Sequence, residues 1–186
     1  MLTLEKVFNN RQNTLEWLSA IYSSVPNTFI NYHQEGPLSD DMAPHAEWTG
    51  WFAYDIVGKQ MGNWNPSSED NNDYWRVLPK KIRQAQIFIQ NVKPIENQNL
   101  TVEEAERMKL EARFLIAYYY ALLVEFYGAV PFTAEPIDLD APYDVLMMQQ
   151  VPVHQVIDWI DNELLEVSKG LPASYTNSTL YGRATS

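Results

Sequence analysis

A histidine among acids is the part of this sequence best suited to acid–base or metal chemistry. His45 follows Asp40 and Asp41 and precedes Glu47, so one loop could place an imidazole beside carboxylates. Such a cluster could act as a general base or hold a hard metal ion. Loop acids are more often simply solvated, and no two histidines here have the i, i+4 spacing of a helical metal site. We therefore expect no catalytic residue and no metal site, with a hydrolase using His45 and Asp40 or Asp41 as a minor alternative.

The remaining motifs of enzyme chemistry are missing from the sequence. It contains neither GxSxG nor GxGxxG nor a phosphate-binding glycine loop, so we expect no cofactor. The chain has no cysteine, which excludes disulfides and cysteine-ligated metals. Its net charge of −11, from 24 acids against 13 bases, repels phosphate backbones and acidic membrane surfaces, so nucleic acid is not an expected partner. No run of 18 apolar residues is present, so no transmembrane helix is predicted.

Aromatic residues interleaved with amides offer a different chemistry, the binding of sugars. Trp64 lies between Asn63 and Asn65 in a stretch rich in turn residues, and Trp48 and Tyr74 flank that stretch. Flat aromatic rings can stack on the apolar faces of sugar rings, while asparagine side chains hydrogen-bond the hydroxyls. These five residues are the predicted ligand-binding site. The alternative is that the tryptophans are core residues of neighbouring helices, and for Trp64 the two interpretations stay equally open.

The elements that must position these residues are predicted to be helices. Apolar residues recur at three- and four-residue intervals in five stretches, which predicts an all-α chain with long irregular loops. The predicted helices lie at roughly 3–25, within 47–59, within 74–92, over about 26 residues from 101, and within 151–172. We expect loops at 26–46 and 60–73, a loop or extended piece at 141–148, and an irregular tail at 173–186 that leaves the core uncapped.

The helix that begins near residue 101 has the clearest start and stop signals. Thr101 followed by Glu104 forms a capping-box pattern, and Gly128 with Pro131 ends the helix. Its second half is apolar on two faces, which requires neighbours on both sides. We therefore expect this helix to be packed between other helices.

The helix within 74–92 combines an apolar stripe with a group of bases. Its stripe begins at Trp75, which we expect to be a core residue, and Pro79 either kinks the helix or lies in its first turn. The basic residues are expected to form a solvated face; they are Arg76, Lys80, Lys81 and Arg83.

The stretch EARFLIAYYYALLVEFYGAVPF, residues 111–132, resembles the signature helix of the SusD/RagB family of Bacteroidetes outer-membrane nutrient-binding lipoproteins. The segment VIDWIDNELLEVSKGLP and the element YGRATS resemble two further motifs of that family, in the same order and spacing. WRVLPKKIRQAQIFIQNV is a weaker match, with Gln86 where the family usually has Asn.

The resemblance implies a fold, and it implies that residues 1–186 are the N-terminal SusD-like helical domain. The tyrosine helix would belong to a tetratricopeptide-like superhelix, with Glu111 and Arg113 as structural polar anchors. Family members are about three times longer and carry an N-terminal lipid anchor, so we expect this chain to be a fragment whose only link to the membrane would be that anchor, outside the sequence.

The resemblance also implies a function, which is binding and not catalysis. Members sit on the cell surface at the outer membrane and capture oligosaccharides or other nutrients for a TonB-dependent, SusC-like transporter. The expected function is therefore nutrient binding, with a glycan as the expected ligand. The alternative is a scaffold domain that binds the transporter, with the ligand site in the missing C-terminal half.

Overall fold

The computed structural model of the chain describes residues 3–26, 74–138, 140–177, 180 and 182–186. The chain divides into two compact units, and the unit formed by Met1–Ser24 and Trp75–Ser186 contains the described helices and strands, apart from the first residue of α5. These elements are helices except for two short strands, which confirms the all-α prediction. They are α1 (Leu4–Phe8), α2 (Arg11–Tyr22), α5 (Tyr74–Asn91), the 3₁₀ helix η2 (Glu96–Gln98), α6 (Val102–Tyr127), β1 (Val130–Pro131), α7 (Tyr143–Leu146), β2 (Gln150–Val151) and α8 (Val153–Ser168).

The N-terminal segment is two helices and not the single helix predicted over 3–25. Thr3 caps α1 as expected, its hydroxyl accepting a bond from the Lys6 amide at 3.4 Å. The break falls at Asn9 and Asn10, and the Asn10 side chain accepts a bond from the Asn13 amide at 3.0 Å. The single-helix prediction was wrong because asparagine side chains compete for backbone amides and so favour caps over helix interiors.

Helix α6 spans the 26 residues that the sequence predicted. Thr101 caps it by accepting a bond from the Glu104 amide at 3.1 Å. The Glu104 carboxylate does not return the bond; it pairs with Arg11 of α2 instead. The helix ends at Gly128, whose φ of +71° is a conformation that residues with a Cβ rarely adopt.

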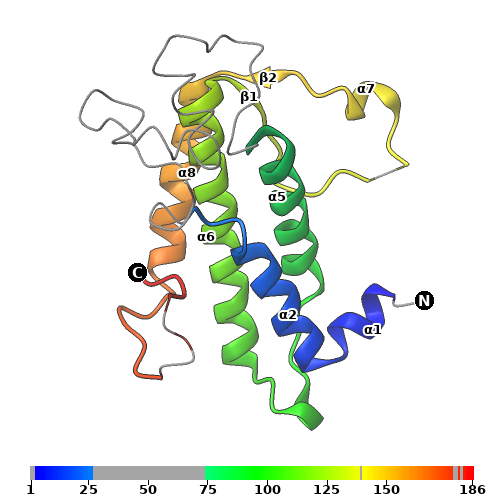
Figure 1. The fold of residues 1–186 in the computed structure, drawn as a ribbon, viewed down its shortest axis with the longest axis vertical. Helices are drawn as coiled ribbons and strands as arrows, with labels where there is room; N and C mark the ends of the chain where they lie inside the picture. Colours follow the sequence, from blue (N-terminus) through cyan, green and yellow to red (C-terminus); the bar gives the residue numbers. More distant parts are fainter. Residues whose placement is uncertain (1–2, 27–73, 139, 178–179, 181) are drawn as a thin grey trace, which may run out of the picture. The chain divides into compact units, whose positions relative to one another are not determined.

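Helix α6 lies between α8 on one side and α2 and α5 on the other (Figure 1). One buried stripe runs along it, comprising Ala105, Met108, Ala112, Leu115, Tyr119 and Leu122. On the opposite side Leu110 and Phe114 pack against buried Val167 and Leu171 at the end of α8. The prediction of two covered faces is therefore confirmed for most of the helix, although Phe126 in its last turn is exposed.

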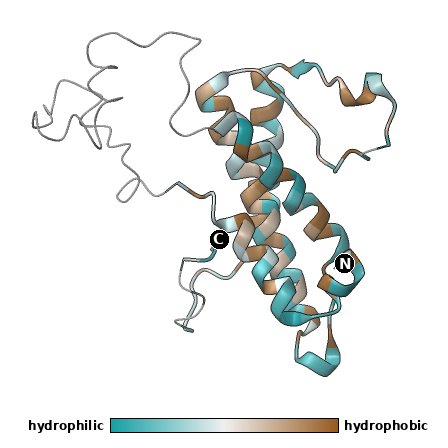
Figure 2. Ribbon diagram, turned by 45° about the vertical axis from the view of Figure 1, so that its right-hand side comes forward, coloured by the Kyte–Doolittle hydropathy of each residue, from teal (hydrophilic) through white to brown (hydrophobic). Residues whose placement is uncertain are grey.

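Helix α5 packs on α1 and α2 through aromatic and polar contacts, with Phe8 in α1 and Trp17 in α2. Phe88 meets Phe8 edge to face with ring centroids 5.8 Å apart, and the Trp17 indole donates to the Gln84 carbonyl at 3.1 Å. Pro79 is the sixth residue of the helix, so it lies inside and not in the first turn. Figure 2 shows brown, hydrophobic positions alternating with teal ones along these helices, as expected for helices that bury one face.

The basic group on α5 is more than a solvated face. Lys81 donates to the Ala20 carbonyl at 2.6 Å, and Arg83 donates to the Ile137 carbonyl. These two side chains therefore tie α5 to the end of α2 and to the segment after β1, and the prediction was wrong for them. It failed because the periodicity of a helix does not reveal which carbonyls the fold brings beside it.

The segments outside the long helices also differ from the expectation. Residues 143–146 form one helical turn, and β2 pairs with β1 in antiparallel register, Val130 opposite Val151. The tail does cover the core: Ala184 is buried in one cluster with Val167 and Leu171, and its carbonyl accepts a bond from the Tyr175 hydroxyl at 3.0 Å. Within the described ranges, no helix has the length and hydropathy to cross a bilayer.

Substituting alanine for Thr101 should lower the free energy of unfolding by about 1 kcal/mol, because the Glu104 amide loses its cap. Serine keeps the hydroxyl, so Thr101→Ser should stay within a few tenths of a kcal/mol of the parent. Urea denaturation followed by circular dichroism measures both changes. Equal losses in the two variants would mean that the cap does not determine the stability of this end of α6.

Candidate functional site

The sequence-predicted ligand residues lie mostly beyond the part of the chain that the structure describes. Trp48, Asn63, Trp64 and Asn65 fall within residues 27–73, and Tyr74 is the first residue of α5. The cluster of His45 with its neighbouring acids, and the short helix predicted within 47–59, lie in the same range. These predictions remain predictions, and the site must be built from the described residues.

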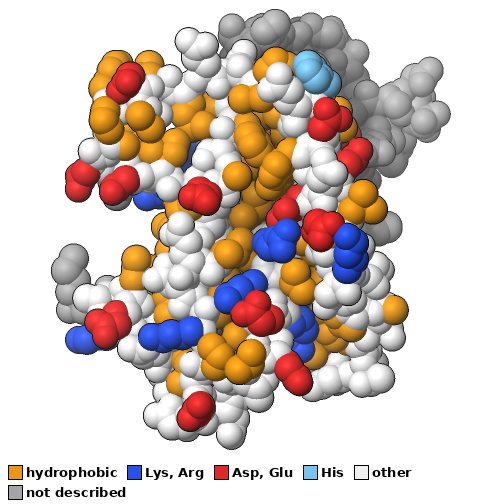
Figure 3. All heavy atoms as spheres, turned by 180° about the vertical axis from the view of Figure 1, so that it is seen from behind, with side chains coloured by type: hydrophobic (Ala, Val, Ile, Leu, Met, Phe, Trp, Pro, Cys, Tyr) orange, Lys and Arg blue, Asp and Glu red, His pale blue; other side chains and the backbone are white. Residues whose placement is uncertain are grey.

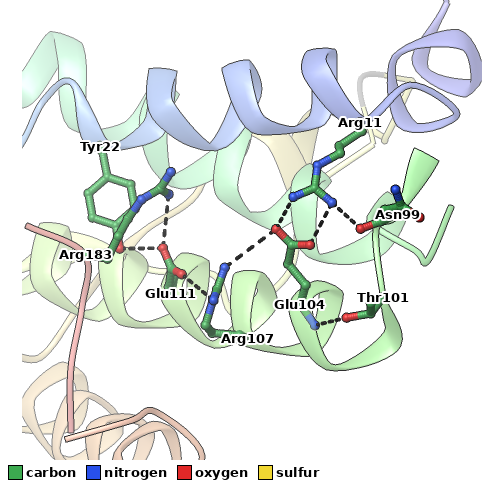
Figure 4. Close-up of polar contacts among 8 residues, drawn as sticks. All are labelled: Arg11, Tyr22, Asn99, Thr101, Glu104, Arg107, Glu111 and Arg183. Atoms are coloured by element: carbon green, nitrogen blue, oxygen red, sulfur yellow. Dashed lines mark hydrogen bonds and ion pairs between the residues drawn. The ribbon is translucent and has the colours of Figure 1, made fainter. Parts of the chain in front are cut away.

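Glu111 is the most deeply buried charged side chain of the described region, with 0% of its surface exposed. One oxygen, Oε2, accepts a bond from the Tyr22 hydroxyl at 2.9 Å and lies 3.1 Å from Nη1 of Arg183 (Figure 4). The other, Oε1, lies 3.3 Å from Nε of Arg107. Burial, reinforced by the nearby Glu111 charge, raises the pKa of the Tyr22 hydroxyl, so this hydroxyl stays protonated and keeps donating.

The same row of charges continues toward the start of α6. Arg11 forms a bidentate pair with Glu104, at 2.8 and 2.7 Å, and also donates to the Asn99 carbonyl (Figure 4). Nη2 of Arg107 lies 3.9 Å from Oε1 of Glu104, which links the two halves of the row. Every carboxylate in the row is held by arginine. The row therefore joins α2, α6 and the tail, and its geometry suits anchoring and not proton transfer.

Arg113, the other charged residue that we expected to be a structural anchor of this helix, is also held in an ion pair. Its Nε and Nη2 atoms lie 2.6 and 2.9 Å from the two carboxylate oxygens of Glu163 on α8. The hydrogen bonds to Glu163 raise the pKa of Arg113, so this residue stays charged. Arg113 thus fastens α6 to α8.

A groove between α5, the second half of α6 and the segment after β1 is the described feature best suited to hold a ligand. Its volume is about 400 Å³, within the range of small-molecule pockets. We call it the Trp75 groove. It is lined by Trp75, Pro79, Ile82, Arg83, Gln86, Tyr120, Leu123, Val130, Pro131, Thr133, Ile137 and Met148.

Trp75 is 47% exposed, so the prediction that it is a core residue was wrong. It lies in the first turn of α5. Its ring packs against that of Tyr127, the last residue of α6, with ring centroids 5.2 Å apart and an interplanar angle of 65°. The apolar stripe of α5 was predicted correctly, but α6 ends beside this turn and leaves the indole partly uncovered. An aromatic residue at the first position of an apolar stripe was the only sequence signal for this exposure.

The floor of the Trp75 groove is fixed by a clamp on Thr133. Its carbonyl accepts bonds from the Gln86 amide at 2.8 Å and from the Tyr120 hydroxyl at 3.1 Å. Its amide donates back to the Tyr120 hydroxyl at 3.1 Å. Gln86 is therefore a positioning residue for this segment. Among the described residues the lining combines apolar side chains with the polar groups of Arg83, Gln86, Tyr120 and Thr133, a composition that suits the binding of a small molecule.

A family model described as "Starch-binding associating with outer membrane" matches residues 5–186 of the chain. The chain belongs to the SusD-like family. The match covers nearly the whole sequence and confirms the resemblance of the tyrosine helix and the motifs that follow it. A search of curated proteins found no match.

Solved SusD-like structures share the fold. BT4246 is 26% identical with a TM-score of 0.70, and the match covers 94% of this chain and 28% of that one. A SusD-like carbohydrate-binding protein from Bacteroides fragilis, BF0978, is 20% identical with a TM-score of 0.70, over 97% and 36% of the two chains. A laminarin-binding SusD-like protein is 19% identical with a TM-score of 0.70, over 95% and 37%. The chain therefore spans about a third of the length of these structures.

Proposed function

We propose that this SusD-like chain is part of a cell-surface protein that binds glycans at the outer membrane and delivers them to a TonB-dependent transporter. The match of the family model over residues 5–186 carries the proposal. The laminarin-binding relative with the same fold supports a carbohydrate ligand. A lipid anchor preceding the matched region, as in other family members, would hold the protein at the membrane.

The chemistry of the Trp75 groove agrees with this role. A half-exposed indole beside an apolar floor can take the C–H face of a sugar ring. Trp75 directly follows Tyr74, one of the residues predicted from the sequence, so the two candidate regions adjoin along the chain. We propose that Trp75 offers a sugar ring an aromatic surface in this groove.

A scaffold role is the second candidate, and the exposed side chains around α7 favour it. Tyr143 is 74% exposed and Met147 is 59% exposed, with Val145 and Leu146 also exposed between them. Four exposed apolar side chains in five residues form a surface that a protein partner could cover. Figure 3 shows orange, apolar side chains grouped at its upper left, on the side where α7 lies. In this alternative the domain binds the transporter, and the glycan site lies in the part of the longer protein that this chain does not include.

Titration with oligosaccharides tests the proposal directly. Maltohexaose or laminarihexaose should give a saturable change in tryptophan fluorescence, and calorimetry should report the same affinity. Trp64→Ala should weaken binding about tenfold or more, as truncation of an aromatic anchor commonly does, and Trp75→Ala should weaken it by a smaller factor.

The control is Trp17→Phe, because this indole faces α5 and not the groove. Unchanged affinity in Trp17→Phe together with losses in the other two variants would support the proposal. No binding of any oligosaccharide to the parent chain would overturn the presence of a glycan site in this domain and favour the scaffold role.

A further inference from the structure

A second groove lies on the other side of the Thr133 segment, between α5, α6 and α8. Its volume is about 310 Å³. We call it the Trp159 groove. It is lined by Gln86, Ile89, Gln90, Arg113, Ile116, Ala134, Glu135, Pro136, Trp159 and Glu163. Gln86 lies in the walls of both grooves, so the clamp on Thr133 fixes the position of one groove relative to the other.

Trp159 supplies this groove with a rigid, half-buried aromatic surface. Its ring meets Phe132 at 4.9 Å and 63°, and Tyr120 at 5.8 Å and 81°. Both angles are steep, so neither neighbour stacks flat on the indole. The two contacts hold the ring from the side and reduce its rotamer freedom. An indole held in this way can accept a flat apolar partner without a further ordering cost.

Around this indole lie an ion pair and two exposed polar side chains. The guanidinium of Arg113 and the carboxylate of Glu163 hold each other in a bidentate pair, which uses Nε and Nη2 and leaves Nη1 outside the pair. Gln90 and Glu135 are exposed at the rim. Within the part of the chain that the structure describes, the Gln90 side chain makes no hydrogen bond, so its amide is free to bind a hydroxyl.

The charges of the lining select among sugars. One guanidinium faces two carboxylates, Glu135 and Glu163, in a chain of net charge −11. A uronic or sialic acid would meet net repulsion here, whereas neutral hydroxyls can accept from Arg113 and Gln90 and donate to Glu135. An apolar partner without hydroxyls would leave these polar groups unpaired.

We propose that the Trp159 groove is a second saccharide subsite, which binds one or two units of a neutral glycan through Trp159, Gln90 and Glu135. This inference rests on the proposed function, because it assigns a further contact to the same class of ligand. Two subsites on one chain, the Trp75 groove and the Trp159 groove, raise the effective concentration of a long glycan at the surface. An oligosaccharide long enough to reach both subsites should therefore gain more affinity than its added sugar units alone would give.

Indole signals in nuclear magnetic resonance spectra test the proposal at the level of single residues. The chain has six tryptophans, and Trp159→Phe assigns the Trp159 Nε1–H peak by its disappearance. On titration of the ¹⁵N-labelled protein with laminarihexaose and maltohexaose, the Trp159 peak should shift and saturate with at least one of them. An oligogalacturonide of the same length should leave the peak in place, because it carries carboxylates.

Variants at the rim separate this subsite from the rest of the protein. Gln90→Ala and Glu135→Ala change exposed side chains, so both should fold, and each should weaken the saturation of the Trp159 peak about fivefold, as loss of one hydrogen-bonding group does. Gln155→Ala and Glu125→Ala are matched controls on exposed helix positions outside the groove, and should leave the curve unchanged.

The possible outcomes keep the two proposals apart. If other indole peaks shift while the Trp159 peak stays in place, the subsite is wrong and the proposed glycan binding stands. If no indole peak shifts with any neutral oligosaccharide, both are overturned for this domain. A Trp159 shift that the rim variants do not alter would also contradict the subsite, because it would report an indirect effect of binding elsewhere.

Discussion

Replacing Glu111 by alanine should lower the free energy of unfolding by about 3 kcal/mol, because the change leaves buried and partly buried donors without their acceptor. Tyr22 and Arg183 donate hydrogen bonds to this carboxylate, and the Arg107 guanidinium forms an ion pair with it at 3.3 Å. Removal of one partner of a buried ion pair commonly costs about 3–5 kcal/mol. The expected loss is at the low end because the Arg107 and Arg183 side chains are 23% and 18% exposed and can still reach water.

The effect should extend to the C-terminal tail. Arg183 reaches Glu111 across 72 positions of sequence, and the neighbouring Ala184 amide donates to the Tyr22 hydroxyl at 3.0 Å. Loss of the carboxylate removes the pair with Arg183 that holds this turn of chain on α6, and it also removes the acceptor of the Tyr22 hydroxyl. Hydrogen exchange at the Ala184 amide should therefore accelerate more than exchange at the centre of α6.

Chemical denaturation of two comparison variants shows whether the loss of stability is specific to the Glu111 carboxylate. Glu111→Gln keeps an acceptor for Tyr22 and should fall between alanine and the parent. Glu106→Ala breaks the exposed pair with Lys109 on the same helix and should cost less than about 1 kcal/mol. If Glu111→Ala costs no more than Glu106→Ala, the anchoring role of Glu111 is wrong.

The helices that the sequence predicted most accurately are those with local signals at their ends. Thr101 and Gly128 delimit α6 within its own sequence, and Pro152 marks the start of α8 in the same way. The two asparagines that split the first helix were also visible, but a single apolar stripe continues across them. Periodicity therefore concealed a break that only the cap of Asn10 produces.

Contacts between distant segments were beyond sequence reasoning. Two ion pairs, Arg183 with Glu111 and Arg11 with Glu104, join residues that are far apart in the sequence. They therefore depend on which segments the fold places beside α6. The Trp75 groove needs Thr133 and Met148 beside α5, and nothing in either local sequence indicates that approach. The predicted ligand residues around Trp64 were chosen on chemistry alone. Their test is the binding experiment.

The three consecutive tyrosines of α6 point in three directions, because successive residues on a helix are about 100° apart. Tyr118 is half-buried and stacks parallel to Phe114, with an interplanar angle of 6°. Tyr119 is 0% exposed, and its hydroxyl donates to the Ile21 carbonyl of α2. Tyr120 faces the other way and clamps Thr133. One run of identical residues thus serves three different interfaces.

Of the three, Tyr119 should have the largest effect on stability. Tyr119→Ala removes a large, fully buried ring from between α6 and α2 and should cost about 3–5 kcal/mol, the range for aromatic-to-alanine changes in a core. Tyr119→Phe keeps the ring and deletes the hydroxyl, which leaves the Ile21 carbonyl unpaired, so about 1–2 kcal/mol is expected. Thermal and urea unfolding of both variants gives the two values.

Tyr118→Phe is the matched control, because it deletes the same hydroxyl from a half-buried ring that has no hydrogen bond within the described residues. It should change the free energy of unfolding by less than about 0.5 kcal/mol. Equal losses in Tyr118→Phe and Tyr119→Phe would contradict the assignment of the middle tyrosine to α2. A large loss in Tyr119→Ala with none in Tyr119→Phe would mean that the ring alone, and not its bond to Ile21, holds α2 on α6.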